Sequence, residues 1–264
     1  MDVILSVRDL SFSYGTHKAL DRVSFEMRRG EILCVMGPNG SGKSTLIDCV
    51  MGIHRPDSGT LILDGKDVQD YRRQEIAQHA AYVPQNHSVT FPYTVREAVM
   101  MGRTAYLSAF GSPNAEDESL AEDAMRRVGI SHLANRPYGS ISGGELRLVL
   151  LARALCQQTP LILMDEPTAH LDYRNELKFL EMICALSKED GIAVLIATHA
   201  PDQAFFLESR GCDVSALFLR AGVAAAKGTP GEIITEDRLA AVYGVRAKIL
   251  ESEGEKTILL RKSL

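Results

Sequence analysis

The chain has 264 residues, of which 45% are hydrophobic, and it carries a formal net charge of −5 with an isoelectric point near 5.8. This length and composition predict one large globular domain with a full core, whereas the acidic balance argues against nucleic-acid binding, which needs a basic face to neutralise phosphates. The most apolar runs are shorter than the ~20 residues that cross a bilayer, and the first residues lack the basic and apolar regions of an export signal, so we expect a cytoplasmic protein whose role at a membrane is peripheral.

The first part of the chain predicts an antiparallel sheet layer that leads into a buried strand and a helix. Apolar and polar residues alternate over residues 3–15 and 17–27, which is typical of half-buried antiparallel strands. The apolar run 31–36 predicts a buried strand, and residues 45–52 have helical spacing. Residues 54–68 then predict a turn, a strand, and a further strand or turn.

The rest of the chain predicts an inserted helical segment and then a parallel sheet. From about residue 88 to 150 the sequence is polar and helix-prone, and we interpret it as a helical subdomain. Buried strands return at 161–165 and 193–198, and the helical run 175–191 between them gives the strand, crossover helix, strand order of a parallel sheet. A hairpin at 215–228, a helix and a last hairpin complete the predicted elements.

A glycine-rich loop joins the buried strand to the first predicted helix. It matches the pattern GxxxxGK[ST] in the strand and helix context that this motif requires. Its backbone N–H groups and the helix N-terminus favour phosphate, Lys43 would span the β- and γ-phosphates, and Ser44 would ligate Mg²⁺. A glycine turn with an unrelated lysine is the alternative, but the flanking elements favour a nucleoside triphosphate site. The predicted binding residues here are Gly37, Pro38, Asn39, Gly40, Ser41, Gly42, Lys43, Ser44 and Thr45.

Two acids end the apolar run 161–165. Asp165 and Glu166 would stand at the carboxyl end of a parallel strand beside the phosphate loop. There Asp165 would hold the Mg²⁺ shell, and Glu166 would polarise the attacking water. Two acids at a strand end are weak evidence alone, and the phosphate loop that precedes them favours the functional interpretation.

Together these motifs resemble the nucleotide-binding subunit of ATP-binding cassette (ABC) transporters, over nearly the whole chain and in the family's order. The further matching stretches are VPQ (83–85), ISGGE (141–145), AHLD (169–172) and ATH (197–199). The resemblance implies an α/β fold, with a P-loop NTPase core containing a mixed sheet, an antiparallel β layer and an inserted α-helical subdomain. Residues 1–264 would form one ABC ATPase domain, with a nucleotide-binding core at 1–87 and 151–215, a helical signature subdomain at 88–150 and a C-terminal hairpin and helix extension at 216–264.

The resemblance also implies roles for three residues around the nucleotide. Tyr14 resembles the aromatic residue that stacks on adenine, although a half-buried strand tyrosine is the alternative. Gln85 resembles the residue that touches Mg²⁺ and the attacking water and relays movement to the membrane partner. His199 resembles the switch histidine that contacts the γ-phosphate and positions Glu166, although a lone histidine at a strand end is often purely structural.

The signature stretch and the D-loop imply a dimer. Ser142, Gly143, Gly144 and Glu145 precede an apolar helix and would present N–H groups to the γ-phosphate bound by Lys43 of the opposite chain. Asp172 resembles the D-loop aspartate at the dimer seam, and a helix-capping role is compatible with it. Two departures from the family pattern, Glu145 in place of glutamine and Ala169-His170 in place of Ser-Ala, bear on coupling rather than on hydrolysis.

The family resemblance implies an ATPase that uses ATP and Mg²⁺ and works as a homodimer around two ATP molecules. Separate transmembrane permease subunits would bind the chain at the cytoplasmic face of the cell membrane. The contact surface would lie in the tract 91–103; the alternative for this tract is simple packing of an amphipathic helix on the core. A substrate-binding protein would take part indirectly, and no nucleic acid is implied. The tracts 94–118 and 140–155 resemble the importer branch that serves iron-siderophore, haem, cobalamin and related metal chelates.

Two other functions of the same cassette remain as alternatives. Soluble ABC ATPases of DNA repair or translation usually carry two cassettes or a long coiled-coil insertion, whereas this chain has one phosphate loop and no sustained heptads. A non-catalytic scaffold of iron-sulfur cluster assembly is the other alternative, and the importer-like character of residues 93–125 argues against it.

Overall fold

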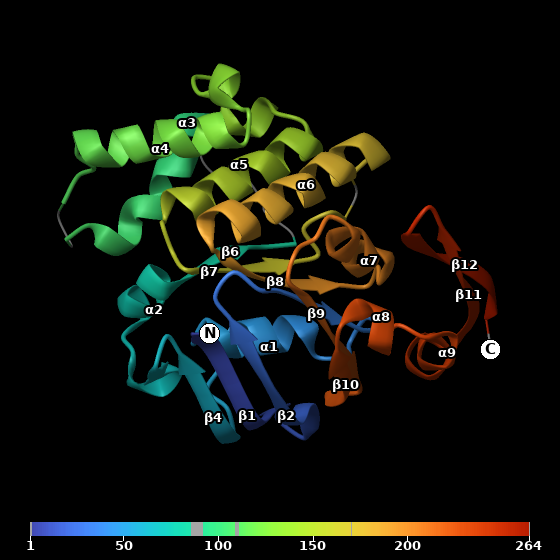
Figure 1. Ribbon diagram of the computed structural model, residues 1–264. Coiled ribbons are helices and arrows are strands. Elements are labelled where there is room, and N and C mark those ends of the chain that lie inside the picture. Colours follow the sequence, from blue (N-terminus) through green and yellow to red (C-terminus); the bar gives the residue numbers. More distant parts are fainter. Residues whose placement is uncertain (1, 86–91, 109–110, 170, 264) are drawn as a thin grey trace.

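A six-stranded sheet runs through the centre of the computed structural model, which describes residues 2–85, 92–108, 111–169 and 171–263 (Figure 1). Its strand order is β10-β9-β3-β8-β7-β6, and all neighbours pair in parallel except the edge strand β10. Every residue of β3, β7 and β8 is buried, as expected of parallel strands covered on both faces. The strands are β3 Ile32–Met36, β6 Ala80–Val83, β7 Leu161–Asp165, β8 Ala193–Thr198, β9 Val214–Arg220 and β10 Val223–Gly228.

An antiparallel sheet with the order β2-β1-β4-β5 covers one face of the central sheet, and this confirms the predicted antiparallel layer. Helix α1 (Lys43–Val50) shares one apolar core with this layer and with β3, β7 and β8, and it lies between the two sheets in Figure 1. The strands of the layer are β1 Val3–Tyr14, β2 His17–Arg28, β4 Ser58–Leu63 and β5 Lys66–Asp67. A 3₁₀ turn at Val68–Asp70 and helix α2 (Arg73–His79) follow, and neither was predicted.

Helices cover the opposite face of the central sheet. Figure 1 shows α3, α4, α5 and α6 on this side, and their buried residues form a second apolar core with the other faces of the same strands. The helices are α3 Val95–Met100, α4 Ala115–Arg127, α5 Gly143–Cys156 and α6 Tyr173–Asp190, with 3₁₀ turns at Met101–Tyr106, Ser131–Leu133 and Tyr138–Ser140. The predicted helical character of this region and the predicted crossover helix between β7 and β8 are confirmed. The predicted boundary at 150/151 falls within α5.

The C-terminal part differs from its expected form in one respect. The predicted hairpin exists as β9 and β10, but β9 also pairs in parallel with β3 and therefore belongs to the central sheet. The predicted boundary at 215/216 thus falls within a strand, because the hydrogen bonds that place β9 come from residues far away in the sequence. Helix α7 (Asp202–Ser209) precedes β9. After β10 come α8 Pro230–Ile233, α9 Glu236–Tyr243, β11 Val245–Ser252 and β12 Glu255–Ser263. The division into core, subdomain and extension stays a prediction.

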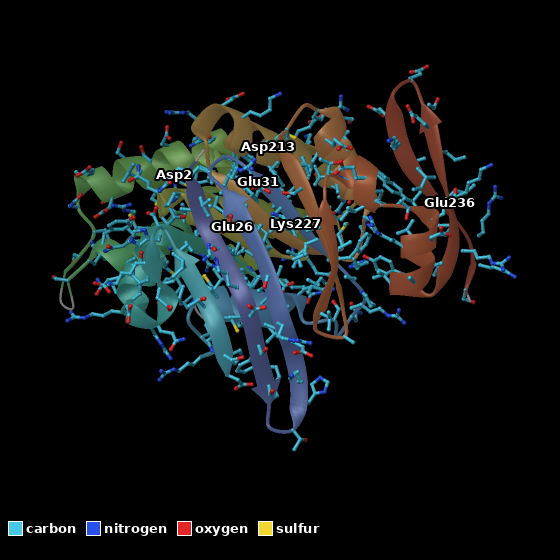
Figure 2. The ribbon with its side chains drawn as sticks, turned by 60° about the horizontal axis from the view of Figure 1, so that its bottom comes forward. Asp2, Glu26, Glu31, Asp213, Lys227 and Glu236 are labelled. Carbon is cyan, nitrogen blue, oxygen red and sulfur yellow. The ribbon has the colours of Figure 1, made fainter. Side chains whose placement is uncertain are left out.

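The two ends of the parallel strands carry different groups of polar residues. Glu31 and Asp213 precede β3 and β9 at the amino ends of the strands, and they lie with Lys227 around one polar hollow (Figure 2). Burial raises the pKa of Glu31, and the backbone amide of Arg28 and the charge of Lys227 partly offset this effect. The sequence motifs of the predicted site lie at the opposite, carboxyl ends. Among the described residues, no helix is long and apolar enough to span a membrane.

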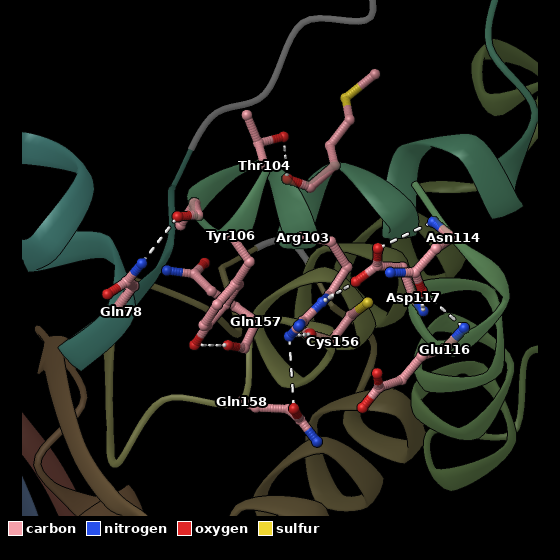
Figure 3. A network of polar contacts seen from close by, with 12 residues as sticks. Gln78, Arg103, Thr104, Tyr106, Asn114, Glu116, Asp117, Cys156, Gln157 and Gln158 are labelled. Atoms are coloured by element: carbon pink, nitrogen blue, oxygen red, sulfur yellow. Dashed lines mark hydrogen bonds and ion pairs between the residues drawn. The ribbon is translucent and has the colours of Figure 1, made fainter. Parts of the chain in front are cut away.

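A polar network holds the helical side together (Figure 3). Arg103 donates from Nε to Oδ1 of Asp117 at 2.8 Å and from Nη1 to the carbonyl of Cys156 at 3.2 Å. Its guanidinium carbon lies 4.0 Å from the ring centroid of Tyr106, whose hydroxyl donates to the carbonyl of Gln157 at 2.9 Å. The network therefore joins the 3₁₀ turn 101–106 to the start of α4 and to the end of α5.

The buried pair Arg103–Asp117 gives a prediction for stability. Arg103→Met leaves a buried carboxylate without its cation, so we expect a lower urea midpoint of unfolding, and Arg103→Met/Asp117→Asn recovers part of the loss because the charge is removed. Arg126→Met is the control, because Arg126 pairs with Asp123 at the surface and exposed pairs contribute little. Equal midpoints for wild type and Arg103→Met in chemical denaturation would contradict the prediction.

Candidate functional site

The phosphate loop fits tightly between β2 and β9. Gly40 and Gly42 have φ angles of +77° and +104°, which side chains rarely allow. A Cβ at Gly42 would stand 2.6 Å from the carbonyl oxygen of Ala19, and one at Gly37 would stand 2.2 Å from that of Leu219. Gly40 is therefore required by backbone conformation, Gly37 by close approach and Gly42 by both, and α1 begins at once with Lys43.

The ammonium group of Lys43 lies within the loop. It donates to the carbonyl oxygens of Gly37 and Pro38, at 2.8 and 3.1 Å, and its Nζ is 3.9 Å from Oε1 of Glu166. Burial lowers the pKa of Lys43, and the charges of Glu166 and Asp165 act in the opposite direction. A partly desolvated cation at the head of a helix suits a polyanion such as a phosphate chain.

Two acids stand at the carboxyl end of β7. Asp165 is 5% exposed, and its Oδ1 has no hydrogen-bond partner among the described residues. Burial raises the pKa of Asp165, and a hydrogen bond with the side chain of Ser44 partly offsets this. Glu166 has a φ of +45° and donates its N–H to the carbonyl of Ala197 at 2.9 Å, and its carboxylate contacts Nδ1 of His199.

A cleft of about 390 Å³ opens beside the phosphate loop. The cleft brings together most of the predicted residues of the nucleotide and metal site, and it adds His17 and Ala19, which the sequence did not single out. Among the predicted phosphate-loop and catalytic residues, those that do not line it are Gly37, Pro38, Ser41 and His199. Tyr14 stands at this cleft with 46% of its surface exposed, and its ring packs edge-on against Phe12. The lining residues are Tyr14, His17, Ala19, Asn39, Gly40, Gly42, Lys43, Ser44, Thr45, Gln85, Asp165 and Glu166.

The backbone at Gln85 is held by an arginine that sequence reasoning missed. Arg147 of α5 donates from Nη1 to the carbonyl of Pro84 at 2.8 Å and from Nη2 to that of Gln85 at 2.5 Å. This contact ties the helix that carries the signature to the glutamine at the cleft. Residues 86–91, including the first residue of the tract 91–103, lie outside the described residues.

The signature residues lie outside the lining of this cleft. Ser142 caps α5: its Oγ accepts from the N–H of Glu145 at 3.3 Å, and Oε2 of Glu145 accepts from the Ser142 N–H and hydroxyl at 2.7 and 2.8 Å. These hydrogen bonds lower the pKa of Glu145. The departure from glutamine thus completes a capping box, in which a carboxylate is favourable at a helix N-terminus.

Asp172 is the N-cap of α6. Its Oδ1 accepts from the backbone N–H of Asn175 at 2.8 Å, and its Oδ2 accepts from Nδ2 of the same residue at 2.9 Å. The capping role that the sequence left open is therefore confirmed, and a role at a dimer seam is compatible with it. His170, the second departure in the D-loop, lies outside the described residues.

A glycine loop between a central strand and a helix, with acids at the end of a neighbouring parallel strand, defines the class of P-loop NTPases. Within that class, the family model described as ABC transporter matches residues 20–169. The chain therefore belongs to the ABC transporter family as an ATP-binding subunit, and it is an ATPase. This confirms the resemblance and the predicted fold class.

The chain is similar in sequence or structure to several known ABC proteins. The hemin import ATP-binding protein HmuV of Bordetella avium is 38% identical over 263 residues, covering 97% of this chain and 98% of the relative. A metal-chelate type ABC transporter solved in an inward-facing conformation has a TM-score of 0.85 and 30% identity, over 100% of this chain and 98% of that one. The cassette MJ0796, solved as a post-hydrolysis dimer bound to ADP and Pi, has a TM-score of 0.74 and 26% identity, over 86% and 98%.

The cap at Asp172 gives a second prediction. Asp172→Ala removes the acceptor for the first turn of α6, so we expect the free energy of unfolding to fall by about 1 kcal/mol, whereas Asp172→Asn retains the cap and changes stability little. Chemical denaturation of both variants measures this. Equal destabilisation by the two substitutions would contradict the capping role. If Asp172→Asn keeps the stability of the wild type but loses ATPase activity, Asp172 has a second role besides capping.

The buried acid Asp165 gives a third prediction. Because burial raises its pKa above the unfolded value, the ionised form destabilises the fold at neutral pH, and this penalty disappears as the pH falls through the folded pKa. Asp165→Asn carries no charge, so we expect a higher Tm than wild type at pH 7 without nucleotide, and a difference that shrinks toward about pH 4. Thermal denaturation over this pH range is the measurement, and a lower Tm for Asp165→Asn at pH 7 would contradict the account.

Proposed function

We propose that this chain is the ATP-hydrolysing subunit of an importer that takes up a metal chelate through separate transmembrane subunits. The observation that carries the proposal is the cleft that joins Lys43, Asp165 and Glu166 to Tyr14 and Gln85. The similarity to the hemin import protein and to the metal-chelate type transporter supports the substrate class.

The residues at the cleft fit a magnesium ion bound together with nucleotide. The buried Oδ1 of Asp165 is without a partner among the described residues, the Ser44 hydroxyl is beside it, and Gln85 lines the same cleft. Ser44, Asp165 and Gln85 supply the oxygen ligands that Mg²⁺ prefers, and the ion would neutralise charge on the phosphate oxygens. Burial raises the pKa of Asp165, and a bound cation would favour its ionised form.

Glu166 and His199 are proposed to act on the attacking water and on the γ-phosphate. The positive φ of Glu166 turns its side chain out of the strand direction, and the contact with Nδ1 of His199 fixes the carboxylate. Glu166 would accept a hydrogen bond from the water and polarise it, while Nε2 of His199 remains available to the γ-phosphate. Lys43 would offset the charge on the phosphate chain.

Tyr14 is proposed to stack on adenine. It lines the same cleft as the phosphate loop, and its hydroxyl is 2.9 Å from Nε2 of His54. The rings of Phe12 and His54 pack perpendicular to the Tyr14 ring and hold it in place, and a flat aromatic ring suits stacking on a flat base.

The signature residues are proposed to complete the site of a second chain. Ser142, Gly143 and Gly144 begin the fourteen-residue helix α5 but do not line the cleft of their own chain. The Ser142 N–H is engaged by Glu145, so the N–H groups of Gly143 and Gly144 at the helix N-terminus, together with the helix dipole, favour an anion. In a homodimer that encloses two ATP molecules, the phosphate-loop cleft of each chain would be completed by the signature of the other. The dimeric structure of the related cassette MJ0796 supports this arrangement.

Coupling to transport is proposed to run through the surface between the helical side and Gln85. The described part of the tract, residues 92–103, contains α3, and Arg147 ties Gln85 to α5. A permease subunit resting there, at the cytoplasmic face of the membrane, would sense the closing of the dimer. A substrate-binding protein would contact the permease rather than this chain.

Copurification tests the transport function. The chain, expressed with the transmembrane proteins encoded beside its gene, is expected to copurify with an integral membrane protein after detergent extraction and to hydrolyse ATP in that complex. Recovery of the chain without any membrane protein, and with full ATPase activity alone, would favour a soluble ABC ATPase instead.

Glu166→Gln tests the hydrolytic role. Loss of the carboxylate removes the group that polarises water, so we expect kcat to fall at least about 100-fold while ATP affinity is retained and a dimer accumulates on size-exclusion chromatography with ATP. The exposed acid Glu181 on α6 provides a matched control, Glu181→Gln. Turnover by Glu166→Gln at the wild-type rate would remove Glu166 from the mechanism.

A further inference from the structure

A single buried amide connects three segments around the proposed hydrolytic site. Gln203 lies in the first turn of α7 and is 4% exposed. Its Oε1 accepts from the hydroxyl of Thr198 at 3.0 Å, and its Nε2 donates to the hydroxyl of Thr168 at 2.7 Å and to Oε1 of Glu176 at 2.7 Å. Gln203 is not part of any motif that the sequence singled out, and it does not line the nucleotide cleft.

Each partner of Gln203 belongs to a segment with a proposed role. Thr198 ends β8 and directly precedes His199. Thr168 is two residues beyond Glu166, and like Gln203 it is buried. Glu176 lies in the first turn of α6, the helix that Asp172 caps. The amide therefore joins the switch segment, the segment after the strand-end acids and the D-loop helix.

Glutamine suits these partners chemically. A carboxylate can only accept hydrogen bonds, so the contact with Glu176 requires the NH₂ group on that side and fixes the orientation of the amide. The same NH₂ group reaches Thr168, and the remaining carbonyl oxygen faces the Thr198 hydroxyl. A glutamate would bring a second carboxylate to within hydrogen-bond distance of Glu176, and a methionine would leave the carboxylate and both hydroxyls without this partner.

We infer that Gln203 is a positioning residue for ATP hydrolysis, which sets the position of the His199 segment relative to the Glu166 segment and links both to α6. The inference rests on the proposed roles of Glu166 and His199. Because catalysis depends on aligned groups, a displacement of one segment against the other lowers kcat. The phosphate loop and Tyr14 do not contact this amide, so nucleotide affinity is independent of it.

Exchange of the two partners tests the inference. In the full-length protein, Gln203→Glu is expected to lower the kcat of ATP hydrolysis at least about tenfold, with the Kd for a fluorescent ATP analogue within about twofold of wild type. The reciprocal variant Gln203→Glu/Glu176→Gln restores one carboxylate facing one amide, and we expect it to recover kcat to within about threefold of wild type. Glu176→Gln alone is the control, because its carbonyl oxygen still accepts from Gln203 and kcat stays near the wild-type value.

The outcomes separate positioning from general stability. Thermal melting accompanies each assay, and Gln203→Met, which keeps length and burial without the hydrogen bonds, takes the place of Gln203→Glu if that variant does not fold. Wild-type kcat in either variant, a loss that appears only in KM, or a loss that the reciprocal exchange leaves unrepaired would overturn the inference. Absence of ATP hydrolysis by the wild-type chain would count against the proposed function. Normal hydrolysis by the wild type together with an unchanged kcat in the Gln203 variants would count against this inference alone.

Discussion

The parallel, in-register pairing of β3, β8, β7 and β6 is the constraint on which the rest of the site depends. Met36 pairs with Thr198, Asp165 with Ala197, and Val83 with Met164, so four strands end at the same edge of the sheet. Each motif follows one of these ends. The phosphate loop follows β3, His199 follows β8, Glu166 follows β7 and the segment with Gln85 follows β6, and their proximity is a consequence of strand order.

Burying charged groups at this edge of the sheet lowers the stability of the fold, and interactions elsewhere in the structure offset that loss. Burial lowers the pKa of Lys43 and raises that of Asp165, so in both groups burial favours the neutral form over the charged form. Apolar burial along both faces of the central sheet supplies the stability that tolerates this. Polar side chains from the helices then hold the segments that leave the strands. Arg147 donates to the carbonyl of Gln85, and Gln203 accepts from the hydroxyl of Thr198, which directly precedes His199.

The sequence predicted features that local patterns encode. The spacing of Gly37 to Ser44, the apolar strands around it and the capping position of Asp172 each follow from a few neighbouring residues. The pairing of β9 with β3 could not be predicted in this way, because the partner strands lie far apart in the chain. Arg147 and Gln203 were missed for the same reason: a lone polar residue on a helix reveals its role only through the backbone or side chains it meets after folding.

A mixing experiment tests most directly whether the phosphate loop and the signature of two chains form one site. On the proposed arrangement, Lys43→Ala would remove the phosphate contact of its own loop, and Ser142→Arg would block the signature that a partner's nucleotide would meet. A mixed dimer of these two inactive variants still contains one intact pairing, the loop of the Ser142→Arg chain with the signature of the Lys43→Ala chain. We therefore predict that ATPase activity appears on mixing, well above the sum of the separate variants. A mixture that remains at that sum would contradict the composite site.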